Sequence, residues 1–519
     1  MHRIDHIELD IITRQSSMTN RIEEELCLLG TTGFWEPLDK VFDTLSDPDA
    51  VWSIGKLSID LYISADGDWR SQLLQQLLQQ LELYFSRHAV SSLAKITART
   101  DTAAQQRQIS SGEEVPDISI LSLSQRRVED FLFYLRAGSY PRLSDAAFYT
   151  QDYLETEFLA ILRQYAGLWR DFVDEYCHLA AIVSKRLVTH CPGRLQQLLL
   201  ELLLPSEAGT IWKAGDHWIR HLQKAALSLR QSHPPDMIFR QAALYEVLSR
   251  WHALPPIEQL LYEIAGKWLQ VVWGDTRKEW RHLHGRIMQS FRHSMRQDIA
   301  AGPQQTVSSS LQALLASALP KTFPSAREIP EFIRETAFAS PDNKPSAAGT
   351  TYDTAHAGMV LLYPYVRHFF DHLHLLDDKG SFCDETARHQ AVYWWHYLAS
   401  GDMELPEYAC ALGKILCGMP IGEPLVHRPQ WRRDDLAETE RLLQTFIGHW
   451  QILRDCSVPA LRETFLLRRG TVEKVREEWH ITVDPQAVDI LLDSLPFTLS
   501  AIRMPWMDAL FVVHWNHSL

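Results

Sequence analysis

The sequence has few cysteines and no closely spaced cysteine pair. Its seven cysteines are an odd number, and none lies three positions from another. A disulfide framework or a Cys-x-x-Cys metal or redox motif is therefore not indicated, and reduced thiols in a cytosolic protein fit better. Cys410 and Cys417 are seven residues apart in a helical segment, so we expect them to share a buried face rather than to bind a metal ion.

Long uncharged apolar runs are also missing. The first residues, MHRIDHIELDIITRQ, alternate charged with apolar side chains, unlike a secretory signal peptide. The richest apolar segment, LQQLLLELLLP at 195–205, contains Glu201 and ends at Pro205. It is far shorter than the about 18 residues that a membrane span needs. We therefore expect a soluble chain that is cytoplasmic when it is made.

The chain lacks an excess of positive charge. Its formal net charge is −14, which argues against a nucleic acid or an anionic membrane as the main partner. Aromatic residues are plentiful by contrast, with 17 tryptophans. Burial in cores and anchoring at protein interfaces would both explain that number.

Nucleotide-binding and hydrolase signatures are absent, since the chain contains neither GxGxxG nor GxSxG. The nearest approach to a phosphate-binding loop is ALGKILCG at 411–418. It lacks the upstream glycine and the Ser or Thr after the lysine that phosphate and magnesium would require. We predict no catalytic residues, no cofactor and no enzyme activity.

One histidine cluster has metal-like spacing. In RHFFDHLHLLDD, His368 and His372 are four residues apart with Asp371 beside them, so they could face one ion. The neighbouring Phe369 and Phe370 favour a simpler interpretation, in which the histidines form the outer face of an amphipathic helix. We predict no metal site here, and whether the pair ever binds an ion is left open.

Hydrophobic periodicity predicts a mainly α fold with small β elements at both ends. Residues 4–11 and 54–63 alternate like half-buried strands, residues 127–300 are helical throughout, and 475–484 and 510–515 are expected to pair in a small antiparallel sheet. The predicted division is an α+β domain at 1–95, a polar linker at 96–126, a helical middle region at 127–300, a Pro/Ser/Ala-rich linker at 301–356, and a helical domain closed by strands at 357–519.

The C-terminal third contains an ordered series of phrases: AGMVLLYPYVRHFFDHLHLLDDKGSF (357–382), AVYWWHYLASGDMELPEYACALGKILCGMP (391–420), LLQTFIGHWQILRDCSVPALRETFLLRRG (442–470) and WHITVDPQAVDILLDSLPFTLSAIRMPWMDALFVVHW (479–515). They resemble the tape measure protein family of contractile injection systems, the phage-tail-like particles of the antifeeding-prophage type. HRIDHIELDI and IGKLSIDLYI resemble that family's opening strand pair. At 495–497 the chain reads LPF where the family typically shows LPW.

The resemblance implies a structural assembly protein that sets the length of an inner tube or initiates the tube. It implies partners among the tube, baseplate or spike proteins, several copies per particle, and a final place inside the particle. It carries no catalytic residues. Fold or docking roles would fall on the family-motif residues: Leu416, Cys417, Gly418, Ser457, Leu461, Arg462, Glu463, Phe465, Leu495, Pro496, Pro505, Trp506, Met507 and Trp515.

Two other interpretations remain beside this one. The tryptophan content and the missing catalytic signatures also fit a helical adaptor or cargo chaperone that binds partner proteins through aromatic faces. An enzyme with a histidine-rich metal site is a third, weaker interpretation.

Overall fold

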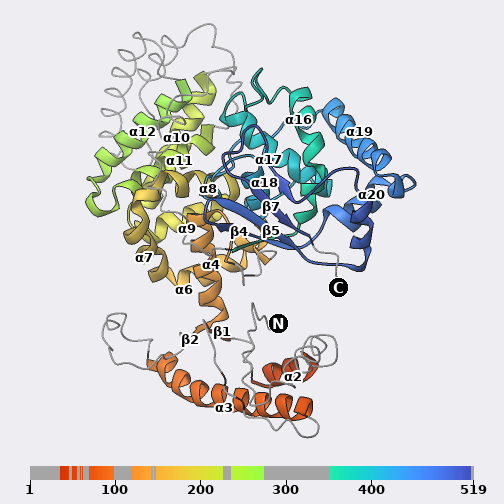
Figure 1. Ribbon diagram of the computed structural model, residues 1–519. Helices are drawn as coiled ribbons and strands as arrows, with labels where there is room; N and C mark the ends of the chain where they lie inside the picture. The colour runs from red at the N-terminus through yellow and green to blue at the C-terminus, as the bar shows by residue number, and fades with distance from the viewer. Residues whose placement is uncertain are drawn as a thin grey trace. The chain divides into compact units, whose positions relative to one another are not determined.

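The computed structural model describes residues 35–45, 50–54, 59, 61, 69–98, 118–141, 144, 148–225, 235–273 and 351–515. The chain forms two compact units, Met1–Arg127 and Val128–Leu519, each of which is described by itself (Figure 1). Helices predominate in the described residues, with a two-stranded sheet in the first unit and a five-stranded sheet in the second. The predicted mainly α fold with small β elements is confirmed.

In the first unit, helix α2 (Trp35–Leu45) packs on the long helix α3 (Trp69–Ala98). Leu38 of α2 and Leu81 and Phe85 of α3 are buried between them, and the rings of Phe42 and Phe85 meet edge to face at 5.8 Å. Leu77 and Leu78 of α3 are partly buried against the same cluster, so α2 packs on the part of α3 around residues 77–85.

The strands of the first unit differ from the predicted ones. Strand β1 is Ala50–Ile54 and pairs antiparallel with β2, Ile118–Ser122, while Ile59 and Leu61 lie outside any strand. Of the strand predicted at 54–63, Ile54 is in β1, Ile59 and Leu61 are in no strand, and the rest lies outside the described residues, as does the strand predicted at 4–11. ISILS at 118–122 was missed because its two-residue period extends over only five residues in a polar stretch.

The second unit begins within α4 and continues through a group of short helices. They are α4 (Leu123–Ala137), α5 (Gln151–Glu155), α6 (Glu157–Gln164), α7 (Ala166–Tyr176), η3 (Cys177–Leu179), α8 (Ala180–His190), α9 (Gly193–Leu203), α10 (Ala208–Ala225), α11 (Pro235–Ser249), η4 (Trp251–Ala253) and α12 (Ile257–Trp273). Their shared core contains Phe131, Trp169 and Trp268, all without exposed surface. The indole of Trp169 donates to the carbonyl of Leu199 at 2.9 Å, so the core aromatics also satisfy polar atoms.

Helices in this group are short. The longest described one, α10, has 18 residues, about 27 Å at 1.5 Å per residue. Helix α12 passes through Gly266 and ends at Trp273, directly before Gly274; the continuation to residue 300 that the sequence allowed lies outside the described residues. The described middle region is thus a packed bundle of helices rather than a rod.

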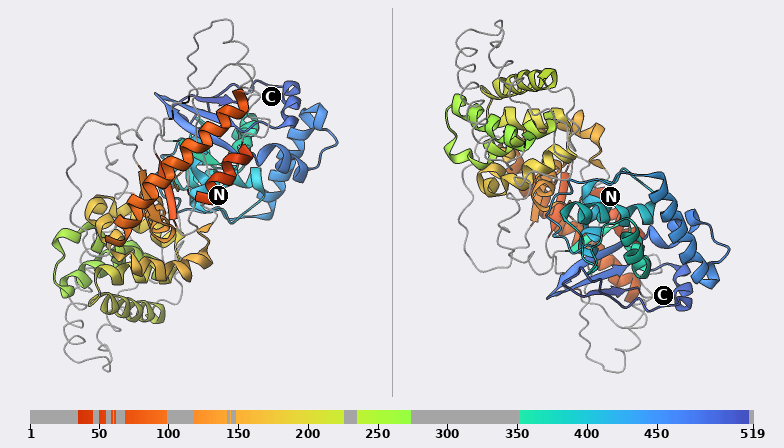
Figure 2. Two further views of the ribbon diagram at one scale, coloured as in Figure 1. Left: turned by 90° about the horizontal axis from the view of Figure 1, so that it is seen from below. Right: turned by 90° about the horizontal axis from the view of Figure 1, so that it is seen from above.

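Residues 351–515 build a second core in the same unit. The helical segments are η5 (Ala357–Leu362), α16 (Tyr363–His372), α17 (Glu385–Ser400), η6 (Glu407–Cys410), α18 (Ala411–Leu416), α19 (Arg433–His449), η7 (Gln451–Leu453), α20 (Val458–Leu461), η8 (Arg462–Leu466) and η9 (Ala487–Ser494). Figures 1 and 2 show these helices and the sheet on one side of the unit, with α5–α12 on the other.

The five-stranded sheet has the order β3-β4-β5-β7-β6. Its strands are β3 (Thr351–Thr354), β4 (Gly470–Val475), β5 (Glu478–Val483), β6 (Ala501–Ile502) and β7 (Phe511–His514). The predicted pairing of 475–484 with 510–515 is confirmed, but β5 and β7 run parallel. The connection through η9 and β6 is long enough for the crossover that parallel strands require.

None of the described helices combines the length and the apolar composition that crossing a bilayer would take.

Candidate functional site

Two of the family phrases meet in the core of residues 351–515. The indole Nε1 of Trp506 donates to the carbonyl oxygen of Leu416 at 2.9 Å. Beside it, Gly418 has φ of +63°, and a Cβ there would lie 2.6 Å from the carbonyl oxygen of Trp506. Glycine is required at this position both for its backbone conformation and for the close approach. KILCG and MPWM are thus two halves of one contact.

Other residues of this contact are buried. Leu416 and Cys417 at the end of α18 and Met507 after Trp506 are at most 5% exposed. The Trp506 ring packs against Phe382, at 5.0 Å between ring centroids. Burial raises the pKa of the Cys417 thiol well above its usual value, so this cysteine stays a protonated core residue.

The phrase SVPALRETFLL forms a short helix that turns into a single π turn. Ser457 caps α20 by accepting a hydrogen bond from the Ala460 N–H at 3.3 Å. The next turn, Arg462–Leu466, is π-helical and closes with a hydrogen bond of 2.8 Å from the Leu467 N–H to the Arg462 carbonyl. Such turns are rare and recur at sites under special constraint.

The constraint here is contact with two other segments. The Arg462 guanidinium donates to the carbonyls of Tyr397 and Leu398, at the C-terminal end of α17. A cation at that position suits the negative end of the helix dipole, and it gives the Tyr397 carbonyl a second donor beside the Gly401 N–H at 2.7 Å. On the other side, Gly358 lies so close to the π turn that a Cβ would be 1.7 Å from the carbonyl oxygen of Phe465.

The last tryptophan belongs to a buried ion pair. Arg468, 1% exposed, binds both carboxylate oxygens of Asp489, at 2.6 and 2.9 Å. Its guanidinium carbon lies 5.3 Å from the ring centroid of Trp515, which is itself 8% exposed. The C-terminal residue of the described chain is therefore held by stacking on a charged group as well as by the sheet.

The predicted motif residues are not gathered at one surface. Leu461 and Phe465 are buried with Leu416, Cys417, Met507 and Trp515, whereas Gly418, Ser457, Glu463, Pro496 and Pro505 are exposed. Arg462, Leu495 and Trp506 are intermediate. The buried members therefore contribute to the core, and the exposed ones lie at the surface of the unit.

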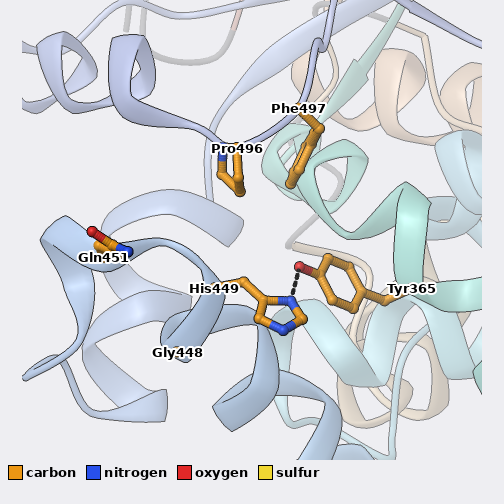
Figure 3. Close-up of a pocket in the computed structure, with 6 residues that line it drawn as sticks. All are labelled: Tyr365, Gly448, His449, Gln451, Pro496 and Phe497. Atoms are coloured by element: carbon orange, nitrogen blue, oxygen red, sulfur yellow. Dashed lines mark hydrogen bonds between the residues drawn. The ribbon is translucent and has the colours of Figure 1, made fainter.

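A shallow pocket of about 430 Å³ contains one of these exposed residues (Figure 3). Pro496 and Phe497 of LPF form one wall, and Tyr365 from α16 and His449 from the end of α19 form another. The Tyr365 hydroxyl bonds His449 Nδ1 at 2.8 Å. Partial burial raises the pKa of Tyr365, so its hydroxyl keeps its proton in this contact.

Sequence reasoning missed a fully buried charge cluster around Glu407. Its carboxylate binds the Arg186 guanidinium at 3.0 and 3.1 Å and the Lys414 ammonium at 2.7 Å, and none of these three side chains has exposed surface. The Tyr134 hydroxyl adds a contact of 3.3 Å. Lys414 lies within the apolar run ALGKILCG. A lysine in such a run is the sequence feature that could have indicated a buried charge here.

Electrostatics show what this cluster can do. Burial by itself would raise the pKa of Glu407, but Arg186 and Lys414 outweigh it and hold that pKa well below its usual range. Burial lowers the pKa of Lys414, and the adjacent carboxylate opposes that effect. A carboxylate saturated by two cations has no tendency to accept a proton near neutral pH, so this arrangement is a structural ion-pair network rather than an acid–base site.

The cluster joins the two cores of the second unit. Arg186 and His190 come from α8, whereas Glu407 and Lys414 come from η6 and α18. His190 Nε2 bonds the carbonyl oxygen of Leu425 at 2.9 Å, and burial lowers its pKa to about 4. The imidazole is thus neutral at pH 7 and donates through Nε2. The helical region and the C-terminal region are fastened together by buried polar contacts.

A second cluster contains two carboxylates and one histidine at a spacing that could suit a metal ion. Ligand atoms of Glu385, His389 and Glu423 lie within 4.8 Å of one another. The backbone N–H of Val426 donates to His389 Nδ1 at 3.2 Å, which places the ring proton on Nε2, facing Glu423 at 3.2 Å. Arg388 also binds Glu423. A metal ion on Nε2 would have to displace that proton and leave a buried donor unpaired, so the group fits an ion-pair network better.

His368 and His372 are exposed on α16, while Phe369 and Phe370 between them are buried. The amphipathic interpretation of this segment is confirmed. The two histidines do not belong to the metal-like group found among the described residues.

Comparison with known proteins assigns the family. The sequence model of the contractile injection system tape measure proteins matches residues 1–515. Searches of curated proteins and of solved structures returned no match. The matched region includes both described units and every phrase named above, and it confirms the resemblance deduced from the C-terminal third. The chain belongs to the contractile injection system tape measure protein family.

Proposed function

We propose that this tape measure family protein acts in tube assembly through a compact docking unit, so that its influence on the tube begins at initiation. The membership establishes a structural assembly role inside a contractile injection particle, together with tube and other particle proteins. The partners we propose are the inner tube, baseplate or spike proteins, met in the cytoplasm by several copies of the chain.

The observation that carries this proposal is the connection between the two cores of residues 128–515. Arg186, Glu407 and Lys414 are completely buried where α8 meets η6 and α18. Separating these cores would expose or isolate three charges, and breaking a buried ion pair costs about 3–5 kcal/mol. Because separating the two cores is costly, we infer that the unit docks as one compact body and does not extend along the tube.

We propose that the docking surface includes the exposed family-motif residues Glu463, Pro496 and Pro505, and that the buried motif residues maintain the fold. Pro496 also forms part of the pocket beside Tyr365 and His449. Proline and aromatic side chains lose little conformational entropy when a partner covers them.

Deleting residues 301–345 is the experiment that separates initiation from measurement by span. The deletion leaves every described helix and strand intact. If the span of the chain sets the length of the tube, removing these 45 residues should shorten the tube. The expected change is about 70 Å if the deleted residues span the tube as a helix, or about 150 Å if they span it as extended chain. Tubes of unchanged length in electron micrographs, present in normal number, would support initiation. Proportional shortening would overturn it.

A companion variant tests the docking surface. Replacing Glu463 and Pro496 with alanine should reduce the number of particles while the purified protein keeps its thermal stability. Changing Glu438 on α19 to alanine serves as a control, since that carboxylate pairs only with exposed Arg441 among the contacts described for it. Normal particle numbers with the docking variant would reject this surface.

A further inference from the structure

The pocket beside LPF lies where two helical segments end. Helix α19 ends at His449, and η9 ends at Ser494, just before Leu495 and Pro496. The indole of Trp450, the residue after α19, donates to the Ser494 hydroxyl at 2.8 Å, so the two ends are held together. The pocket in Figure 3 is therefore lined from the C-terminal ends of both segments.

These ends make the surroundings of the pocket electronegative. Among the described residues, no donor reaches the carbonyl oxygens of Ile447, Gly448 and His449 in the last turn of α19. Such carbonyls form the negative end of the helix dipole, which attracts a cation. Exposed Asp493 in the last turn of η9 adds a carboxylate beside them.

The walls of the pocket suit a cation as well. Tyr365 and Phe497, both of intermediate exposure, line it with aromatic rings, and a ring face attracts positive charge. Apart from the His449 imidazole, no basic side chain is among the lining residues. The next basic residue along the chain, Arg454, lies 3.6 Å from the carboxylate of Asp455. The pocket is thus complementary to a positive group supplied from outside.

We propose that this pocket receives an arginine side chain of a partner protein in the particle. The inference rests on the proposed function, because it names the chemistry of the partner that meets the docking surface at Pro496. A guanidinium stacks flat on aromatic rings and carries five N–H donors in a fixed fork, so it can bond several carbonyls at once. A lysine ammonium is a compact point charge without a stacking plane.

Exposed apolar side chains beside the pocket indicate a protein rather than a free cation. Ile452, next to Gln451, and Ile490 of η9 are 54% and 66% exposed. Arginine is enriched at the centres of protein interfaces. Its methylene stem packs on apolar atoms while its charged head enters a polar pocket. A partner segment would cover both isoleucines, whereas a small cation would leave them in water.

The test compares N-acetyl-arginine amide with N-acetyl-citrulline amide, which has a similar shape and no charge, by saturation-transfer NMR on the full-length chain near pH 7.5. The arginine probe should bind about 5- to 10-fold more tightly. Gln451→Lys should abolish that preference, because its ammonium competes for the same carbonyls. Gln164→Lys, on the exposed end of α6, adds the same charge elsewhere and should keep the preference. Equal binding of the two probes to the parent, or equal loss in both lysine variants, would overturn the proposal.

Two changes at Phe497 separate its aromatic face from its apolar bulk. Phe497→Leu should weaken binding of the arginine probe about 3-fold, whereas Phe497→Trp should keep or strengthen it, because tryptophan attracts cations best. Gln451 is exposed, so Gln451→Lys should retain the parent unfolding temperature, which excludes misfolding as the cause of its loss. Arginine binding by Phe497→Leu as tight as that of the parent would contradict the assignment.

Particle counts separate this inference from the proposed function. Gln451→Lys should lower the number of particles relative to Gln164→Lys, and equal numbers would overturn the arginine pocket as a docking site. If the arginine probe has no preference, the pocket chemistry is wrong, even where the deletion of 301–345 supports initiation. If the preference holds but that deletion shortens the tubes, initiation is wrong and the pocket stands.

Discussion

The indole of Trp506 donates a 2.9 Å hydrogen bond to the carbonyl oxygen of Leu416, across 90 residues of sequence. The last carbonyls of a helix have no partner within the helix. This hydrogen bond supplies one to the carbonyl of Leu416, the last residue of α18. The bulky ring and the polar N–H therefore have separable roles. The first packs against Phe370 and Phe382, and the second satisfies a backbone acceptor.

Trp506→Phe should lower the free energy of unfolding by about 1–2 kcal/mol, because it keeps a ring but removes the donor to Leu416. Trp506→Ala should cost about 2–4 kcal/mol, because the packing against Phe382 is lost as well. Urea unfolding of the full-length chain, followed by circular dichroism, measures both.

Assembly adds a second readout for the same variants. If Trp506 acts through the fold, particle numbers should fall in the order of the stability losses. A stable Trp506→Phe protein that fails to enter particles would instead place this side chain at a docking contact.

Gly418→Ala should destabilise the chain by about 2–3 kcal/mol. The residue has φ of +63°, and the added Cβ would lie 2.6 Å from a backbone oxygen of Trp506 that cannot easily move. Gly167→Ala is the matched control, since nothing lies within 4 Å of a Cβ at that position in α7. Its stability should be unchanged or raised by up to about 1 kcal/mol. Equal effects of the two substitutions would show that the KILCG turn has no special constraint.

Glu407→Gln should be more damaging than Arg186→Met. Without the Glu407 carboxylate, Arg186 and Lys414 are two buried cations beside each other, and the expected loss is about 3–5 kcal/mol. Without Arg186, Glu407 keeps Lys414 as a partner, so the loss should be about 1–2 kcal/mol smaller. Urea midpoints of the two variants give the order.

The control for this comparison is Glu438→Gln on α19. Glu438 pairs with exposed Arg441 at 2.8 Å, and exposed pairs contribute less than about 1 kcal/mol. If Arg186→Met proved the worse of the two buried substitutions, Lys414 would not be an effective partner for Glu407, and the network would reduce to a single ion pair.

Sequence patterns predicted the parts of this molecule that depend on local period and on ordered phrases. Phe369 and Phe370 are buried and His368 is exposed because a helix places them on different faces, which a 3.6-residue period already implies. The pairing of β5 with β7 also followed from two β-rich runs. Their parallel direction did not, since it depends on the path taken by the intervening residues.

The ion-pair network around Glu407 could not have been derived in the same way. Arg186 and Glu407 are 221 residues apart, and each on its own resembles an ordinary surface charge in the sequence. Only the packing of α8 against η6 and α18 makes them partners. Likewise, the pairing of His480 with Val512 depends on strand register, which a single sequence does not specify.

Acidification from pH 7 toward pH 4 should destabilise the chain through its buried histidines. Burial lowers the pKa of His190 and of His356 to about 4. An unfolded histidine takes up its proton near pH 6.5. Between these values the unfolded chain binds more protons, so the free energy of unfolding falls as pH falls, by up to about 1–3 kcal/mol per histidine. The low pKa of Glu407 adds a further loss only below its unfolded value of about 4.3.

His356→Gln should therefore have a smaller difference between urea midpoints at pH 7 and pH 5 than the parent, whereas exposed His368→Gln should match the parent. Parallel pH profiles for all three proteins would mean that His356 takes up its proton as readily in the folded chain as in the unfolded one.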